Sequence, residues 1–242
     1  MRTLLCVCAS EFGWEVAQWQ GVCRKKAREF DKTFVLTDPS RGDLYADFAE
    51  VINPLNIIDR DGLPRTNAIL AWQKDRVYQD SEQEFRRFGS DYTEKDQGFD
   101  ILIHARNSNK TFKNYPAPLW DKVLEGLSNY RIASIGKKEA SLHLPGTTSL
   151  LGIGINCLSR IMAKSGAVVG PSSGPIHLAQ HCGTPVVSWA DNKIYMGRTT
   201  VKDRLEKAWN PFGVPAVVLE DKHWKPKPDE VIEKIESFLR NP

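Results

Sequence analysis

The sequence contains no apolar run long enough to cross a membrane. Such a span takes about 18 to 20 consecutive apolar residues, and every apolar stretch among the 242 residues is shorter. The first residues, from Met1 to Leu5, lead to Glu11 before the apolar core of a signal peptide is complete. Internal repeats and low-complexity segments are also missing. We therefore expect a globular cytoplasmic protein.

The sequence also lacks the cysteine pattern of a disulfide framework or a zinc site. Its five cysteines are an odd number without paired spacing: Cys6, Cys8, Cys23, Cys157 and Cys182. Secreted disulfide scaffolds and metal sites show even, clustered cysteines. Buried thiols in a reducing compartment are the expectation.

Basic residues outnumber acidic residues only slightly. The formal net charge is +3, with 33 basic and 30 acidic residues. Residues 1–97 have 14 basic and 17 acidic side chains, whereas residues 98–242 have 19 and 13. The second part is thus mildly biased toward an anionic ligand, but the bias does not require a nucleic acid.

Apolar strand patterns alternate with helical ones along the chain, which is typical of an α/β protein with parallel sheets. The predicted strands are 3–9, 32–37, 99–103, 131–135, 167–169, 185–189 and 214–219. The predicted helices are 13–30, capped by Ser10, 67–88, capped by Thr66, 119–127, 151–166, 175–181 and 229–239. The polar segment 89–98 predicts a linker, so we expect two Rossmann-like lobes, 1–97 and 98–242. Functional residues should lie in the loops that follow the strands.

The segment 166–189 predicts a strand, a loop of small residues, a short helix, a glycine stop and another strand. Ser172, Ser173 and Gly174 precede the helix that begins near Pro175. Free N–H groups and the positive dipole end at a helix start form an anion site. The alternative is that one serine only caps the helix.

The stretch Gly170-Pro-Ser-Ser-Gly-Pro-Ile-His-Leu-Ala179, followed by Gly183-Thr-Pro-Val-Val187, resembles the C-terminal signature of the heptosyltransferase-like glycosyltransferases. The resemblance implies the two-lobed GT-B fold. Family members usually have an acidic residue at the position of Ser172. They are also longer, which implies that the N-terminal lobe is reduced in this chain.

By this resemblance, residues 98–242 form the nucleotide-sugar lobe and residues 1–97 the acceptor lobe. The donor diphosphate would lie over Ser173, Gly174 and Pro175, with the amides of Ile176 and His177 as donors. An acidic residue in the loop after strand 131–135 would contact ribose, which makes Glu139, beside Lys137, a candidate. The alternative for these two residues is a solvated charge cluster.

Arg106 follows strand 99–103 in the loop His104-Ala-Arg-Asn107. Its guanidinium is permanently charged and can bind two phosphate oxygens at once. We expect it to clamp the diphosphate.

Carboxylates directly follow the first predicted strand, in Ser10-Glu11-Phe-Gly13-Trp-Glu15. Inverting glycosyl transfer needs a base that removes the acceptor hydroxyl proton. The family places an acidic residue just after a glycine here, which favours Glu15, after Gly13, with Glu11 next. The alternative is that both carboxylates only favour the first turn of a helix.

The triplet Asp59-Arg60-Asp61 has the spacing of a metal-chelating D-x-D motif. It precedes Gly62-Leu-Pro64, which favours a charged turn. We expect a metal-independent reaction without a cofactor, in which amides and Arg106 neutralise the leaving diphosphate.

The sequence thus predicts a glycosyltransferase that moves a sugar from a nucleoside-diphosphate donor to an unknown acceptor, with inversion. The acceptor classes left open are a glycan, a lipid-linked sugar and a nucleic acid. Two alternatives keep the fold: a nucleotide-sugar epimerase and a non-catalytic nucleotide-sugar or glycan-binding protein.

Overall fold

The computed structural model describes residues 1–53, 66–73, 76, 78–91, 98–194 and 199–240. The chain forms two compact units, Met1–Arg86 and Arg87–Pro242. The boundary expected from the sequence lies further along the chain, between residues 97 and 98. In the structure Phe88 belongs with the second unit, because its N–H donates to the carbonyl of His181 at 2.9 Å. No helix in the described residues is both long and apolar enough to span a membrane.

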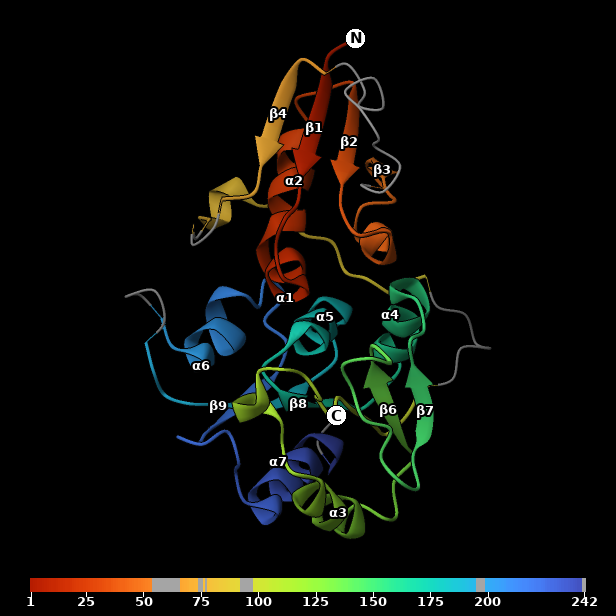
Figure 1. Ribbon diagram of the computed structural model, residues 1–242, viewed down its shortest axis with the longest axis vertical. Helices are drawn as coiled ribbons and strands as arrows, with labels where there is room; N and C mark the ends of the chain where they lie inside the picture. Colours follow the sequence, from red (N-terminus) through yellow and green to blue (C-terminus); the bar gives the residue numbers. More distant parts are fainter. Residues whose placement is uncertain (54–65, 74–75, 77, 92–97, 195–198, 241–242) are drawn as a thin grey trace. The chain divides into compact units, whose positions relative to one another are not determined.

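The first unit contains a parallel sheet in the order β3-β2-β1-β4 (Figure 1). Its strands are β1 (Thr3–Val7), β2 (Lys32–Leu36), β3 (Glu50–Ile52) and β4 (Ala68–Ala71). Between β1 and β2 the chain forms one helix with three parts: α1 (Phe12–Trp14), a π-helical turn (Glu15–Trp19) and α2 (Gln20–Ala27). The predicted strand–helix–strand opening is confirmed.

The predicted helix over residues 67–88 is wrong. Ala68–Ala71 forms β4, which pairs in parallel with β1 from Leu4 to Val7. Among the later residues that the structure describes, the helical part is a short 3₁₀ turn, Asp80–Glu82. Thr66 therefore caps no helix. The apolar stripe of this segment is thin, and the open edge of β1 offers backbone hydrogen bonds that override helix propensity.

The second unit contains a parallel sheet in the order β10-β9-β8-β5-β6-β7. Its strands are β5 (Ile101–Ile103), β6 (Ile132–Gly136), β7 (Thr148–Leu151), β8 (Ala167–Pro171), β9 (Val186–Ala190) and β10 (Ala216–Glu220). The five strands predicted for this unit are confirmed, and β7, in a segment not expected to form a strand, is a sixth. Together the two parallel sheets confirm the α/β class with two Rossmann-like units, of which the first has the smaller sheet among the described residues.

The helices of the second unit cover both faces of its sheet. They are α3 (Ala117–Gly126), α4 (Ile155–Ala163), α5 (Gly174–Cys182), α6 (Val201–Asp203), which runs into a π-helical turn (Arg204–Ala208), and α7 (Pro228–Arg240). Helix α7 packs against α3, β8 and β9, while α4 packs against α5. Figure 1 shows α3 and α7 on one side of β8 and β9, with α5 on the other.

Helix α4 begins later than its apolar stripe predicts. Leu151 was expected to be its first buried position, but this residue ends β7, and the helix starts at Ile155. The reason is that residues 148–151 pair in parallel with β6. No pattern in the sequence indicated α6.

The core of the second unit includes a cluster of three fully buried aromatic rings. The ring centroids of Tyr115, Trp120 and Trp189 lie 4.8 to 5.6 Å apart. These residues come from the loop after β5, from α3 and from β9, so the cluster packs α3 and the loop before it against the sheet.

All five cysteines are free thiols, as expected from their number and spacing. Cys6, Cys23 and Cys182 are buried, and Cys8 is half-buried. Cys157 is exposed, contrary to the expectation that all five thiols are buried.

Candidate functional site

The strand order of the second unit reverses between β5 and β8. From β5 the chain builds outward through β6 and β7, then returns to the other side of β5 with β8 and continues through β9 to β10. In open parallel sheets, ligands bind beyond the carboxyl ends of the strands at such a reversal. The two loops that leave this point contain His104 and Ser173. Both loops were expected from the sequence to hold site residues.

Ser173 and His104 form a hydrogen bond across this point. His104 Nδ1 and Ser173 Oγ are 2.8 Å apart, and both side chains are buried. Ser173 stands at the N-cap of α5, but its side chain makes no capping hydrogen bond. The capping alternative is therefore wrong for Ser173. Ser172 is half-buried, and its N–H donates to the carbonyl of Trp189 at 3.3 Å.

The amides at the start of α5 have other hydrogen-bond partners than the sequence predicted. The N–H groups of Ile176 and His177 both donate to the carbonyl of Ser173, at 3.1 and 3.3 Å. They close the first helical turn and are not available as ligand donors. Pro175 has no N–H. The amide of Gly174, the first residue of the helix, has no intrahelical partner, so it is the donor that this helix start presents.

His177 is buried beside the helix start rather than exposed to a ligand. Its ring packs against Trp209, with centroids 5.2 Å apart. Burial, helped by the charges of Arg204 and Lys113, lowers the pKa of His177 to about 3. The imidazole is therefore neutral at physiological pH.

Those two cations lie close enough to His177 to affect its pKa, and neither was named as a candidate from the sequence. Lys113 Nζ lies 4.3 Å from the centroid of the Trp224 ring, and Arg204 lies over Trp209 at 4.9 Å. Lys113 follows β5 in the same loop as Arg106, so the rule that functional residues follow strands was a signal for it. Arg204 comes from the π-helical turn after α6, which no local sequence pattern indicated.

Arg106 lies in the loop after β5, as expected, and is half-buried. Its Nε donates to Ser108 Oγ at 2.9 Å, and its backbone pairs with Ser141. Burial of His104 is the main cause that lowers its pKa to about 3, and the charge of Arg106 is the second cause. Arg106 is thus within electrostatic reach of the residue that holds Ser173.

Lys137 and Glu139 occupy an exposed turn after β6. The turn is closed by the N–H of Ala140, which donates to the carbonyl of Lys137 at 3.1 Å. The strand before it, β6, is the neighbour of β5, so the turn stands at the same carboxyl edge of the sheet as the start of α5. Both side chains are accessible to a ligand at that edge.

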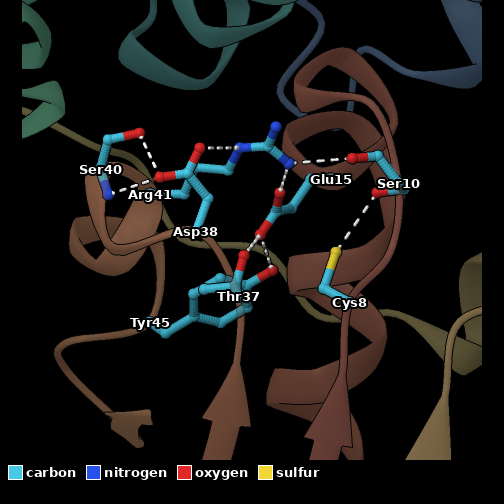
Figure 2. Close-up of polar contacts among 8 residues, drawn as sticks. All are labelled: Cys8, Ser10, Glu15, Thr37, Asp38, Ser40, Arg41 and Tyr45. Atoms are coloured by element: carbon cyan, nitrogen blue, oxygen red, sulfur yellow. Dashed lines mark hydrogen bonds and ion pairs between the residues drawn. The ribbon is translucent and has the colours of Figure 1, made fainter. Parts of the chain in front are cut away.

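In the first unit the strand order reverses between β1 and β4, and the loop after β1 leads to a buried carboxylate. The Glu15 side chain is fully buried. Figure 2 shows its two oxygens surrounded by donors: Oε1 accepts from Thr37 Oγ1 at 2.7 Å and from Tyr45 Oη at 2.8 Å, and Oε2 accepts from Arg41 Nη1 at 2.5 Å.

Burial and the charge of this carboxylate both affect the pKa values of its neighbours. Burial, together with the negative charge of Glu15, raises the pKa of Tyr45 well above its ordinary value. The same two causes raise the pKa of Cys8 to about 12. For Arg41, burial lowers the pKa, but the hydrogen bond to Glu15 outweighs it and the net shift is upward. Arg41 therefore stays charged beside Glu15, and Tyr45 and Cys8 stay neutral.

Arg41 connects this cluster to the loop after β1. The same Nη1 that contacts Glu15 also donates to the carbonyl of Ser10 at 2.9 Å (Figure 2). Its Nε lies 3.7 Å from an oxygen of Asp38. Arg41 therefore fixes the path of the chain between β1 and α1.

Glu11, the other candidate base, is exposed, and Gly13 lies within α1. Glu11 occupies the N-cap of α1 without a side-chain capping bond. Ser10, expected to cap this helix, instead places its hydroxyl 3.3 Å from Cys8 Sγ. The geometry favours Glu11 over Glu15 as a base, because both oxygens of Glu15 are already used by donors inside the protein.

The described residues contain no group of three or more His, Cys, Asp or Glu side chains suited to a metal ion. The triplet Asp59-Arg60-Asp61 lies outside the described residues. The structure therefore does not test the D-x-D interpretation.

The fold matches known structures along the whole chain. A family 9 glycosyltransferase from Veillonella parvula superimposes with a TM-score of 0.66 and 11% identity, covering 100% of this chain and 98% of that chain. The Escherichia coli heptosyltransferase WaaC, solved with ADP-2-deoxy-2-fluoro heptose, gives 0.64 and 10% identity, covering 97% and 99%. The chain has the heptosyltransferase fold.

A third similar structure is that of TibC, a dodecameric iron-containing heptosyltransferase from E. coli in complex with ADP-D-beta-D-heptose. Its TM-score is 0.62 and its identity 14%, over 98% of this chain and 77% of that chain. In sequence, no protein-family model and no curated protein matches this chain. The resemblance seen in the glycine-rich segment is thus confirmed at the level of the fold.

Proposed function

We propose that the protein is a metal-independent glycosyltransferase that uses a nucleoside-diphosphate sugar. The supporting observation is the start of α5, which presents Ser173 and Gly174 at the strand-order reversal of a chain with the heptosyltransferase fold. Two of the similar structures were solved with ADP-sugars. In this proposal the second unit binds the donor and the first unit binds the acceptor.

The donor diphosphate lies against the start of α5. The Gly174 amide and the Ser173 hydroxyl donate to its oxygens, and the positive end of the helix dipole favours its charge. Arg106, Lys113 and Arg204 supply cations around this point. Three cations and a helix start can neutralise a leaving diphosphate without a metal ion.

The nucleoside extends toward the turn after β6. In this proposal Glu139 accepts hydrogen bonds from the ribose hydroxyls, and Lys137 of the same turn contacts a phosphate oxygen. Support comes from their exposure and from their place at the carboxyl edge of the sheet. Ser172 replaces the family's usual acidic residue, and its short hydroxyl reaches less far than a carboxylate.

Glu11 is the general base. It removes the proton of the acceptor hydroxyl while the acceptor oxygen bonds to the anomeric carbon from the face opposite the leaving group. The bond between the anomeric carbon and the phosphate oxygen breaks, and its electron pair leaves with the nucleoside diphosphate. The product has inverted configuration. Glu15 contributes through Arg41, which holds the carbonyl of Ser10 next to Glu11.

A thermal-shift screen of nucleoside-diphosphate sugars tests the donor, because a ligand that binds only the folded state raises the melting temperature. The best donor is then incubated with candidate acceptors, and the products are identified by mass spectrometry. Transfer of the sugar supports the proposal. Isomerised donor indicates an epimerase, and binding without turnover indicates a binding protein. Absence of any shift across the panel contradicts all three.

A further inference from the structure

His104 occupies the point where the strand order reverses, and its side chain links the two sides. It follows β5 directly, and its N–H donates to the carbonyl of Val169 on β8 at 2.8 Å. Its Nδ1 then reaches Ser173, beyond the end of β8, at 2.8 Å. One residue thus joins the ends of both central strands through its backbone and its ring.

The space for this imidazole depends on two glycines. Gly136 ends β6, and a Cβ there would lie 2.8 Å from His104 Cδ2. Gly170 lies in β8, and a Cβ there would lie 2.6 Å from the carbonyl oxygen of His104 and 3.2 Å from its Cβ. The strands on both sides of β5 therefore lack side chains where they approach His104. This fit leaves the ring little freedom.

The bond to His104 changes what Ser173 does. A serine at an N-cap normally accepts a hydrogen bond from an amide of the first helical turn. Ser173 has the extended backbone of an N-cap residue but no side-chain capping bond, and its hydroxyl is held by His104 instead. The serine oxygen is thereby directed away from the first-turn amides of α5 and held at the strand-order reversal instead.

The charge state of His104 allows the serine to donate. Burial, with the nearby charge of Arg106, lowers the pKa of His104 to about 3, so the ring is neutral and has one N–H. If that N–H is on Nδ1, it donates to Ser173 Oγ and leaves the hydroxyl hydrogen for a phosphate oxygen. In the opposite tautomer, Nδ1 would accept the hydroxyl hydrogen of Ser173, and the serine could not donate it to a phosphate oxygen.

We infer that His104 is a positioning residue of the diphosphate site, which donates from Nδ1 to Ser173 Oγ and turns the serine hydroxyl toward the ligand's phosphate oxygens. The inference rests on the proposed function and goes beyond it, since His104 itself touches no ligand. Its effect should therefore pass entirely through Ser173.

The test is calorimetry of the full chain with ADP, UDP, GDP and CDP, and with the nucleoside of the best binder. The variants are His104→Leu, His104→Asn, Ser173→Ala and the double variant His104→Leu/Ser173→Ala. Asparagine can present an N–H near the position of Nδ1, whereas leucine cannot. His181→Leu is the matched control, because His181 is a buried histidine of α5 that packs between Phe88 and Phe212.

We expect His104→Leu and Ser173→Ala each to weaken nucleoside-diphosphate binding about tenfold, the loss of one hydrogen bond to a charged group. The double variant should be no weaker than the single variants, because both remove the same interaction. His104→Asn should recover most of the affinity. Nucleoside binding should not change, and His181→Leu should alter thermal stability but not diphosphate affinity.

Two results separate this inference from the proposed function. If the wild type binds a nucleoside diphosphate and His104→Leu binds it equally well, or if the two losses add, the positioning role is wrong while the function stands. If the wild type binds no nucleoside diphosphate, both fail. If His104→Leu does not fold, the variants Ser173→Ala and His104→Asn provide the test. Unchanged diphosphate affinity in Ser173→Ala overturns the inference. A full tenfold loss of affinity in His104→Asn also overturns it.

Discussion

Arg41 Nη1 donates both to the carboxylate of Glu15, at 2.5 Å, and to the carbonyl of Ser10, at 2.9 Å. A fully buried acid is thereby coupled to the loop that holds the exposed Glu11. The two carboxylates that follow β1 differ in their surroundings: Glu15 is enclosed by donors, and Glu11 is exposed. This difference leads to opposite predictions for the two matched substitutions.

Glu15→Gln should destabilise the protein by about 3 kcal/mol, the cost of leaving a buried charge without its partner. The amide is nearly the same size, but it cannot neutralise Arg41, and its NH₂ group would face donors. The free energy of unfolding in urea measures this loss. Glu11→Gln is the matched control and should change stability by less than about 0.5 kcal/mol, as expected for an exposed site.

Glu11→Gln should reduce turnover about a hundredfold or more, the usual contribution of a general base. Donor affinity should stay at the wild-type level, because the proposed donor site lies in the other unit. Initial rates with the identified donor and acceptor, together with calorimetry, check both statements. Near wild-type turnover would exclude Glu11 as the base.

Stability should fall in mild acid because His104 and His177 are buried in the neutral form. Their pKa values are about 3 in the folded protein, against 6.5 when exposed. The unfolded chain therefore binds more protons below pH 6.5, so stability is lost as the pH falls through 6.5 and continues to be lost toward pH 3. Between pH 7 and pH 5 we expect a loss of about 2 kcal/mol for each histidine.

Urea unfolding at several pH values between 7 and 5 measures this dependence. The His177→Asn variant cannot titrate at that position, so it should lose about half of the slope. Equal stability of the wild type at pH 7 and pH 5 would show that neither ring is buried as described.

Gly170→Ala should disturb both stability and the diphosphate site. The added methyl group would lie 2.6 Å from the His104 carbonyl oxygen, so the strand end must shift. We expect a loss of about 2 kcal/mol from overpacking and weaker nucleoside-diphosphate binding. Gly146→Ala is the control: its Cβ meets nothing within 4 Å, and only its backbone φ of +77° is unfavourable.

For that control we expect a cost of about 1 kcal/mol from the left-handed backbone and unchanged ligand affinity. Thermal unfolding and calorimetry on both variants distinguish the two effects. If Gly170→Ala binds the diphosphate as tightly as the control does, the close contact with His104 has no role in the site.

The sequence predicted the strands whose cores are apolar on both faces. Strands such as β8 and β9 are buried along their whole length, so each reads as a continuous apolar run. Strands β4 and β7 could not be predicted from a continuous apolar run. Both are edge strands, short and partly exposed, and their strand state comes from backbone pairing with β1 and β6 rather than from their own residue pattern.

The sequence by itself determined the alternation of strands and helices, the loop of small residues before α5 and the two carboxylates after β1, because these depend on local composition and spacing. Only the tertiary structure decided which of these groups are available. Contacts between residues distant in the chain enclose Glu15 with Thr37, Arg41 and Tyr45, and turn Ser173 toward His104. The partners of these hydrogen bonds are 22 to 69 residues apart in the sequence, so no local sequence pattern indicates them. They meet only when the sheets have formed.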